Sequence, residues 1–137
     1  MSYDSTFKQM LKSLFELYAE NPSIEVISLA TTDGFPVCTV NKNNSEFEED
    51  SLAAAASTLH SVSNAVTQQI LGKRFKITFI EAQQGNVAFV SLECKNRDFV
   101  LVMSAQQTLN IASLRLLISR LAKEISDLDI STAATSF

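Results

Sequence analysis

The sequence is poor in the residues on which active sites and covalent scaffolds are usually built. It has one histidine and two cysteines among 137 residues. Cys38 and Cys94 do not form a C-x-x-C pair, which argues against a zinc site or a disulfide scaffold, and we expect two reduced, partly buried thiols. Because a single histidine leaves little for metal or triad chemistry, we interpret His60 as a polar-face residue or an interface hydrogen-bonding residue.

The sequence also lacks common catalytic and nucleotide-binding motifs, which argues against several classes of enzyme. The sequence has no glycine-rich phosphate-binding motif, no H-E-x-x-H and no G-x-S-x-G. A net charge of -4 argues against nucleic acid as a main ligand, because phosphate binding needs a basic surface. The polar start MSYDSTFKQM has no apolar signal region, so we expect a cytoplasmic protein. The sequence therefore predicts a non-enzymatic protein without a cofactor or a metal.

Glycine and proline are also scarce, with three and two residues, which predicts short loops and regular elements. A hydrophobic content of 46% with 19% charged residues is typical of a folded chain. The length favours one domain. We predict a single domain over residues 1–125 and a flexible tail over residues 126–137.

One long stretch organises the rest of the chain. Ser51–Gly72, SLAAAASTLHSVSNAVTQQILG, contains no charged residue, whereas an ordinary surface helix carries charge on its wet face. On a helix its larger apolar residues share one side: Leu52, Ala55, Ala56, Leu59, Val62, Val66 and Ile70. Ala54, Thr58 and Ala65 form an adjoining side of small residues. The pattern indicates a helix covered both by its own core and by a partner, or else a helix wholly buried in a monomer. Its polar residues are too frequent for membrane insertion.

The charges of this element gather at its ends. Ser45 and Glu48 have the spacing of a capping box. Glu46, Glu48, Glu49 and Asp50 crowd the start, and the helix dipole explains them better than a cation site does. Gly72 is placed to end the helix in a left-handed conformation, before Lys73 and Arg74. Nothing in the spacing of Arg74, Arg97, Arg115 and Arg120 marks a phosphate-binding residue, so we expect them on a solvated surface.

Periodicity and turn residues predict the other elements. They are helices over residues 5–19 and 108–125, strands over residues 24–30, 35–40, 75–82, 87–92 and 99–103, and a polar loop over residues 93–98. Asp33-Gly34 is a hairpin turn, and Pro36 places its strand at a sheet edge.

The fold class is therefore α+β, with the order α-β-β-α-β-β-β-α and a five-stranded antiparallel sheet. Residues 87–92 and 99–103 are apolar on both faces, so both faces of the sheet need cover. We expect the long helix on one face and the two terminal helices on the other.

The element order and four stretches resemble the roadblock family, the dynein light-chain and GTPase-regulator domain. The stretches are EVISLATTDGFPV (25–37), EEDSLAAAASTL (48–59), LGKRFKITFI (71–80), and FVLVM (99–103) followed by a helix with Leu114-Arg115. The resemblance covers residues 7–125, and the C-terminal extension departs from the motor-associated members.

The resemblance implies a roadblock fold that forms a homodimer through the long helix and the third strand. Carried onto this chain, the interface comprises Ala54, Ala55, Thr58, Leu59, Val62, Ala65, Val66, Phe75, Ile77 and Phe79. We expect the large-residue stripe of the helix to face its own sheet and the small-residue side to pack against a second copy.

The resemblance also implies an interaction role. Our first hypothesis is a homodimeric regulator or scaffold that binds a small Ras-like GTPase and modulates its nucleotide cycle or location. Two alternatives stay open. One is a structural adaptor of a motor or signalling complex without GTPase contact, and the other is a small-molecule sensor with an apolar pocket between sheet and helix.

Overall fold

The computed structural model describes residues 5–42 and 47–135 and contains three helices and five strands in the predicted order. The elements are α1 (Ser5–Tyr18), β1 (Ile24–Thr31), β2 (Pro36–Asn41), α2 (Glu49–Leu71), β3 (Ile77–Ala82), β4 (Gly85–Cys94), β5 (Arg97–Gln106) and α3 (Ile111–Thr135).

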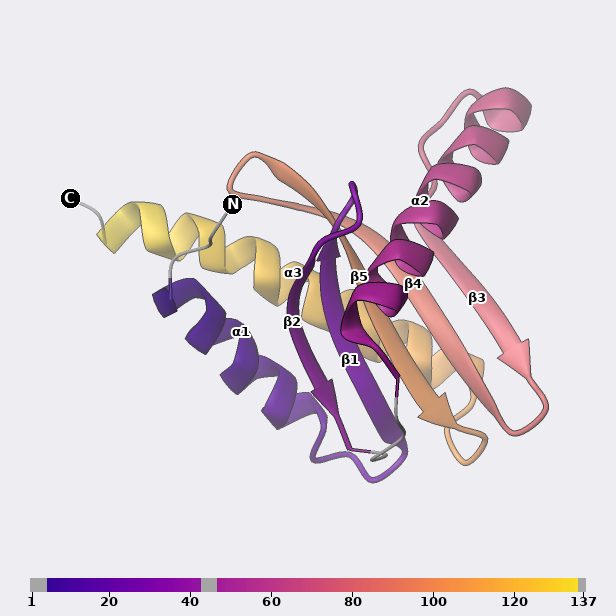
Figure 1. Ribbon diagram of the computed structural model, residues 1–137, viewed down its shortest axis with the longest axis horizontal. Coiled ribbons are helices and arrows are strands. Elements are labelled where there is room, and N and C mark those ends of the chain that lie inside the picture. The colour runs from indigo at the N-terminus through magenta and orange to yellow at the C-terminus, as the bar shows by residue number, and fades with distance from the viewer. Residues whose placement is uncertain (1–4, 43–46, 136–137) are drawn as a thin grey trace.

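The five strands form one antiparallel sheet in the order β2-β1-β5-β4-β3. Helices α1 and α3 cover one face, while α2 crosses the other face alone (Figure 1). Strand β2, which begins at Pro36, lies at an edge of the sheet. The predicted fold class, the distribution of the helices and the edge position of this strand are therefore confirmed.

The main core lies between the sheet and the α1/α3 layer. Its largest fully buried side chains include Phe7 and Phe15 of α1, Phe99 of β5, and Leu114 and Ile118 of α3. A second, smaller core lies under α2, where Ala53 and Ala56 pack among Ala30, Phe89, Val100 and Val102. Both central strands, β4 and β5, contribute to the two cores, because successive side chains of a strand point to opposite faces.

Several predicted boundaries were wrong. The polar loop over residues 93–98 is reduced to a turn at Lys95 and Asn96, which both have positive φ, while the β4–β5 ladder continues to the pair Cys94 and Arg97. Strand β3 begins at Ile77, after Phe75. Helix α3 begins at Ile111 and runs to Thr135, so most of the segment predicted as a tail is helical.

The predicted C-cap of α2 is present, whereas the predicted capping box at its N-terminus is not seen among the described residues. Gly72 adopts φ 66° at the C-cap, and its N–H donates to the carbonyl oxygen of Gln68. At the other end, the N-cap residue is Glu48, whose side chain makes no capping hydrogen bond. Ser45, the first residue of the predicted capping box, lies outside the described residues.

The orientation predicted for α2 was wrong for most of its large-residue stripe. The residues that face the sheet are small or polar, and Ala53 and Ala56 are its only fully buried positions among the described residues. Most of the large-residue stripe instead points away from the sheet, with Val62 54% exposed and Val66 49% exposed, whereas Ala56 of that stripe is fully buried and Leu59 packs against the small core. The physical reason is that the polar side chains have hydrogen-bond partners on the sheet, and the alanines let the helix lie close to it.

Matched substitutions on α1 test the position of the main core. Leu11 is fully buried and Leu17 is 57% exposed on the same helix. We expect Leu11→Ala to lower the free energy of unfolding by about 2–5 kcal/mol and Leu17→Ala to change it by no more than about 0.5 kcal/mol. Urea denaturation followed by circular dichroism measures both. Equal losses at the two positions would contradict this packing.

Candidate interaction surface

A row of hydrogen bonds joins α2 to the sheet. Ser57 Oγ donates to the carbonyl oxygen of Thr32 in the β1–β2 turn. His60 Nε2 lies 3.1 Å from Ser91 Oγ on β4, and Ser63 Oγ lies 2.9 Å from Thr78 Oγ1 on β3. We call these contacts the polar seam. Because buried polar groups need partners, the seam fixes which side of α2 faces the sheet.

The seam continues past β3. Asn64 Oδ1 accepts a hydrogen bond from the backbone N–H of Phe75, at 3.3 Å. The Phe75 ring is buried and meets the His60 ring edge to face, with 5.1 Å between the ring centroids. The chain that follows α2 is thereby held against the helix just before β3 begins.

His60 lies within this seam, close to charged groups of two other segments. Burial lowers the pKa of His60, the Asp98 carboxylate opposes this by raising it, and the Arg74 guanidinium lowers it further. Arg74 and Asp98 themselves form an ion pair of 3.7 Å on the surface. His60 is therefore a hydrogen-bonding residue between α2 and β4 of the same chain. The alternative of a hydrogen bond across an interface stays a prediction.

The outward side of α2 and the α2-facing side of β3 both carry exposed apolar residues, which we call together the α2–β3 surface. It comprises Leu59, Val62, Val66 and Ile70 of α2 with Ile80 of β3. Leu59 and Val87 both pack against the small core under α2, and Val87 lies opposite Ile80 in the β3–β4 ladder. Leu59, at the margin of the stripe, therefore packs on the side of α2 that faces β4 and its neighbour β3.

The two edges of the sheet differ in their protection. At the β2 edge, Pro36 begins the strand, the register with β1 shifts between Leu29 and Ala30, and α1 packs alongside. Proline and bulges are devices that block edge pairing. Strand β3 has neither a proline nor a register shift against β4. Its outer edge is therefore open to another strand.

The structure separates the ten residues predicted for the dimer interface into three groups. Ala54, Ala55, Thr58, Val62, Ala65 and Val66 are exposed on α2, and Leu59 is half-buried there. Ile77 and Phe79 are half-buried on the other face of the sheet, where they pack against the main core. Phe75 is buried inside the chain, so its side chain lies below the surface.

Sequence reasoning missed Ile80 as part of this surface. Ile80 is 44% exposed and lies on the same face of β3 as Thr78, which the alternation of the strand already indicated. Ile70 and Leu71 at the end of α2 are also largely exposed. Two exposed aromatic residues were missed as well: Phe35 at the β1–β2 turn and Phe47 before α2.

The other candidate residues do not converge on one site. Arg115 and Arg120 lie on α3, across the sheet from α2, whereas Arg74 follows the end of α2. Glu48, Glu49 and Asp50 are exposed at the start of α2, and Glu46 lies outside the described residues. Among the residues that the structure describes, no three His, Cys, Asp or Glu side chains are grouped as metal ligands.

The cysteines lie in separate parts of the fold. Cys38 is half-buried on β2, and its pKa is raised mainly by burial. Cys94 is buried on β4, and its Sγ donates to the carbonyl oxygen of Ile125 at 3.4 Å. The expectation of partly buried thiols holds for Cys38, whereas Cys94 is fully buried, and the reduced state of both stays a prediction. In the described part of the chain, no helix is long and apolar enough to cross a membrane.

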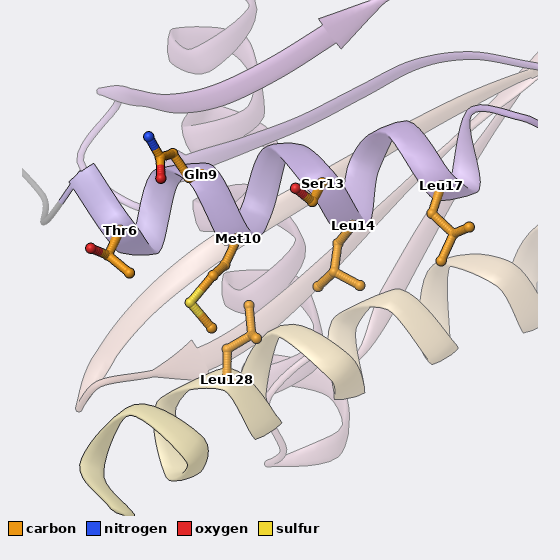
Figure 2. A pocket seen from close by; sticks show the side chains of 7 residues that line it. All are labelled: Thr6, Gln9, Met10, Ser13, Leu14, Leu17 and Leu128. Carbon is orange, nitrogen blue, oxygen red and sulfur yellow. The ribbon is translucent and has the colours of Figure 1, made fainter. Parts of the chain in front are cut away.

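A shallow hollow of about 510 Å³ lies along the line of contact between α1 and α3. Figure 2 shows Met10 and Leu14 of α1 facing Leu128 of α3 across it. The other lining residues, all on α1, are Thr6, Gln9, Ser13 and Leu17. No residue of the sheet lines it. The hollow therefore differs from the sheet-to-helix pocket expected of a small-molecule sensor. A smaller hollow of about 230 Å³ does lie between the sheet and α3, where Ile77 and Val90 face Ala122.

The fold is a five-stranded antiparallel sheet flanked by helices, with an exposed apolar surface at α2 and β3. The chain belongs to the Roadblock/LC7 domain family, whose model matches residues 10–105. The resemblance found in the sequence is thereby confirmed. A comparison with curated protein sequences gives no match.

Solved structures share the fold at low sequence identity. MglB of Myxococcus xanthus is 16% identical, with a TM-score of 0.82 over 96% of this chain and 95% of that chain. The gliding protein MglB of Thermus thermophilus is 12% identical, with a TM-score of 0.80 over 96% of each chain. A Roadblock/LC7 domain of Streptomyces avermitilis is 17% identical, with a TM-score of 0.71 over 85% of this chain and 94% of that chain.

The position of His60 predicts a pH-dependent stability. Because its pKa in the folded chain lies below its ordinary value of about 6.5, folding disfavours the protonated ring. The stabilisation is complete above about pH 6.5 and is lost as the pH falls toward the folded pKa. We expect the free energy of unfolding to fall between about pH 7.5 and 5.5, where ordinary carboxylates scarcely titrate. Urea titrations of the wild type and His60→Gln measure this, and an unchanged slope in the variant would refute it.

Proposed function

We propose that this chain is a non-enzymatic homodimer that binds a small Ras-like GTPase and modulates its nucleotide cycle or location. The observation that carries the proposal is the α2–β3 surface, an exposed apolar stripe beside an open strand edge, in a member of the Roadblock/LC7 family. Exposed apolar patches on a folded domain mark sites of protein association.

Self-association would cover this surface in one step. A second copy that pairs with β3 satisfies the backbone groups of the open edge and also brings a second α2 beside the first. Val62, Val66 and Ile70, which are about half-exposed or more in the single chain, would then leave water. One solved relative, an MglB, has a tetrameric arrangement, which supports self-association as a property of this fold.

The GTPase would bind the part of α2 that self-association leaves open. The small-residue side, with Ala54, Thr58 and Ala65, is exposed and adjoins the large stripe. We assign it to the GTPase in place of the second copy that the sequence led us to expect there. Small side chains let a partner approach the helix closely. No arginine lies on α2, which favours ordering of the partner's switch loops over an arginine finger as the route to faster hydrolysis.

The proposed dimer predicts that a charge on the apolar stripe of α2 disrupts dimerisation but leaves the single chain folded. Val66→Glu would place an unpaired charge in the interface, at a cost of several kcal/mol, while leaving the partly exposed position tolerable in the single chain. Light scattering at micromolar concentration should report a dimer for the wild type and a folded monomer for Val66→Glu. Gln68→Glu adds the same charge on the other flank and should remain a dimer. A monomeric wild type would refute the homodimer.

The GTPase hypothesis predicts a second, independent effect. We expect the wild type to bind the GTP-loaded form of a Ras-like GTPase encoded by a neighbouring gene and to change its single-turnover hydrolysis rate. Ala54→Arg should weaken binding about tenfold or more, about 1.4 kcal/mol, without altering the dimer. Arg74→Ala should leave the rate change intact if switch-loop ordering is the mechanism. Absence of binding to every neighbouring Ras-like GTPase would count against the proposal.

A further inference from the structure

The β3–β4 hairpin determines which backbone groups β3 leaves unpaired. Ala82 lies opposite Gly85 across the two-residue turn Gln83-Gln84, and the ladder continues without a shift to the pair Ile77 and Val90. A two-residue turn closes with a hydrogen-bonded pair, and bonded and non-bonded pairs alternate along an antiparallel ladder. The N–H and C=O groups of Ile77, Phe79 and Glu81 therefore point away from β4, toward the open edge.

Two-fold symmetry restricts how this edge can pair with its own copy. In a symmetric antiparallel pair, each contact occurs twice, and residues opposite each other share one face of the sheet. The symmetry axis must then pass beside a residue that faces its own equivalent. The possible centres differ in how many outward-pointing residues find partners.

We propose that the second copy pairs through β3 with Phe79 at the centre. This register places Ile77 opposite the partner's Glu81, Phe79 opposite the partner's Phe79, and Glu81 opposite the partner's Ile77, so all three outward-pointing residues are paired. A centre at Thr78 or Ile80 pairs only two of the three within the strand. A centre at Glu81 sets two like charges opposite each other, which is unfavourable.

Side chains favour the same register. On the face that carries α2, Thr78 lies opposite the partner's Ile80, and two such β-branched pairs flank the axis. On the other face, the two Phe79 rings meet, and aromatic cross-strand pairs stabilise sheets. The antiparallel arrangement also brings Lys76, at the start of one strand, to the end that carries the partner's Glu81.

The polar seam connects this centre to α2. Ser63 lies 2.9 Å from Thr78, the residue next to Phe79. Val66 follows Ser63 by one helical turn, on the exposed stripe. The stripes of the two copies are therefore brought toward the same axis as the strands. The inference rests on the homodimer proposed above and adds its register.

Cysteine cross-linking tests the register. We would refold Thr78→Cys and Ile80→Cys chains together and oxidise them with diamide. Opposed non-hydrogen-bonded residues have Cα atoms about 4.5 Å apart, within disulfide reach, whereas a displacement of two residues exceeds the limit of about 7 Å. We expect a covalent dimer from the mixture and none from either variant alone. The wild type, with only Cys38 and Cys94, is the control for the native thiols.

A second pair of variants tests the register without removing the hydrogen bond between Thr78 and Ser63. Lys76 and Ala82 are both exposed and lie opposite each other's equivalents only in the proposed register. Lys76→Cys mixed with Ala82→Cys should also cross-link. Efficient cross-linking of Thr78→Cys alone or of Ile80→Cys alone would overturn the register and leave the dimer standing. A wild type that is monomeric by light scattering would overturn both.

Discussion

The hydrogen bonds between α2 and the sheet are the constraint on which the rest of this molecule depends. A helix that crosses a sheet alone normally buries its large apolar residues. Here Ser57, His60 and Ser63 lie underneath, each with a partner on the sheet or its turn. Ala53 and Ala56 fill the remaining contact and let the helix lie close. Because this side is occupied by polar groups and alanines, Val62, Val66 and Ile70 of the apolar stripe are left exposed, and the α2–β3 surface follows from that arrangement.

The sheet shows the same division between a closed and an open side. Its β2 edge has a proline, a register shift and a covering helix, whereas its β3 edge has none of these. Isolated open edges expose proteins to unwanted pairing, and they persist where a specific strand is meant to occupy them. The stripe of α2 and the open edge lie together, so a single partner can cover both. Because the apolar stripe and the strand edge are close together, backbone hydrogen bonds at the edge would fix the orientation of a partner that buries the apolar residues.

Much of the fold could be predicted because its signals are local. The alternation of β3, the Asp33-Gly34 turn, Pro36 at an edge and Gly72 at a helix end each act within a few residues. The orientation of α2 could not be predicted in the same way. Its large stripe and its polar side are both regular, and the choice between them depends on Ser91, Thr78 and the Thr32 carbonyl, which are distant in sequence. The boundary of α3 was missed because periodicity weakens after Ile125 while the helix continues. Only part of the α2–β3 surface could be predicted. The periodicity of the sequence indicated the α2 residues, whereas the exposure of Ile80 and the burial of Phe75 depend on how the helix packs on the sheet.

The far end of α2 has a thermodynamic consequence. Figure 1 shows its last turns projecting beyond the sheet at the corner where β3 begins. Ile70 and Leu71 there are largely exposed, and the Gly72 cap holds the helix end with backbone bonds to Gln68 and Thr67. Short helical segments without tertiary cover are marginal in water, and such segments open locally at little cost. Whatever binds this end also orders it, so part of the binding free energy is spent in fixing the helix. The affinity of a partner that binds there would therefore depend on temperature in two ways, through the folding of the helix end and through the contacts formed.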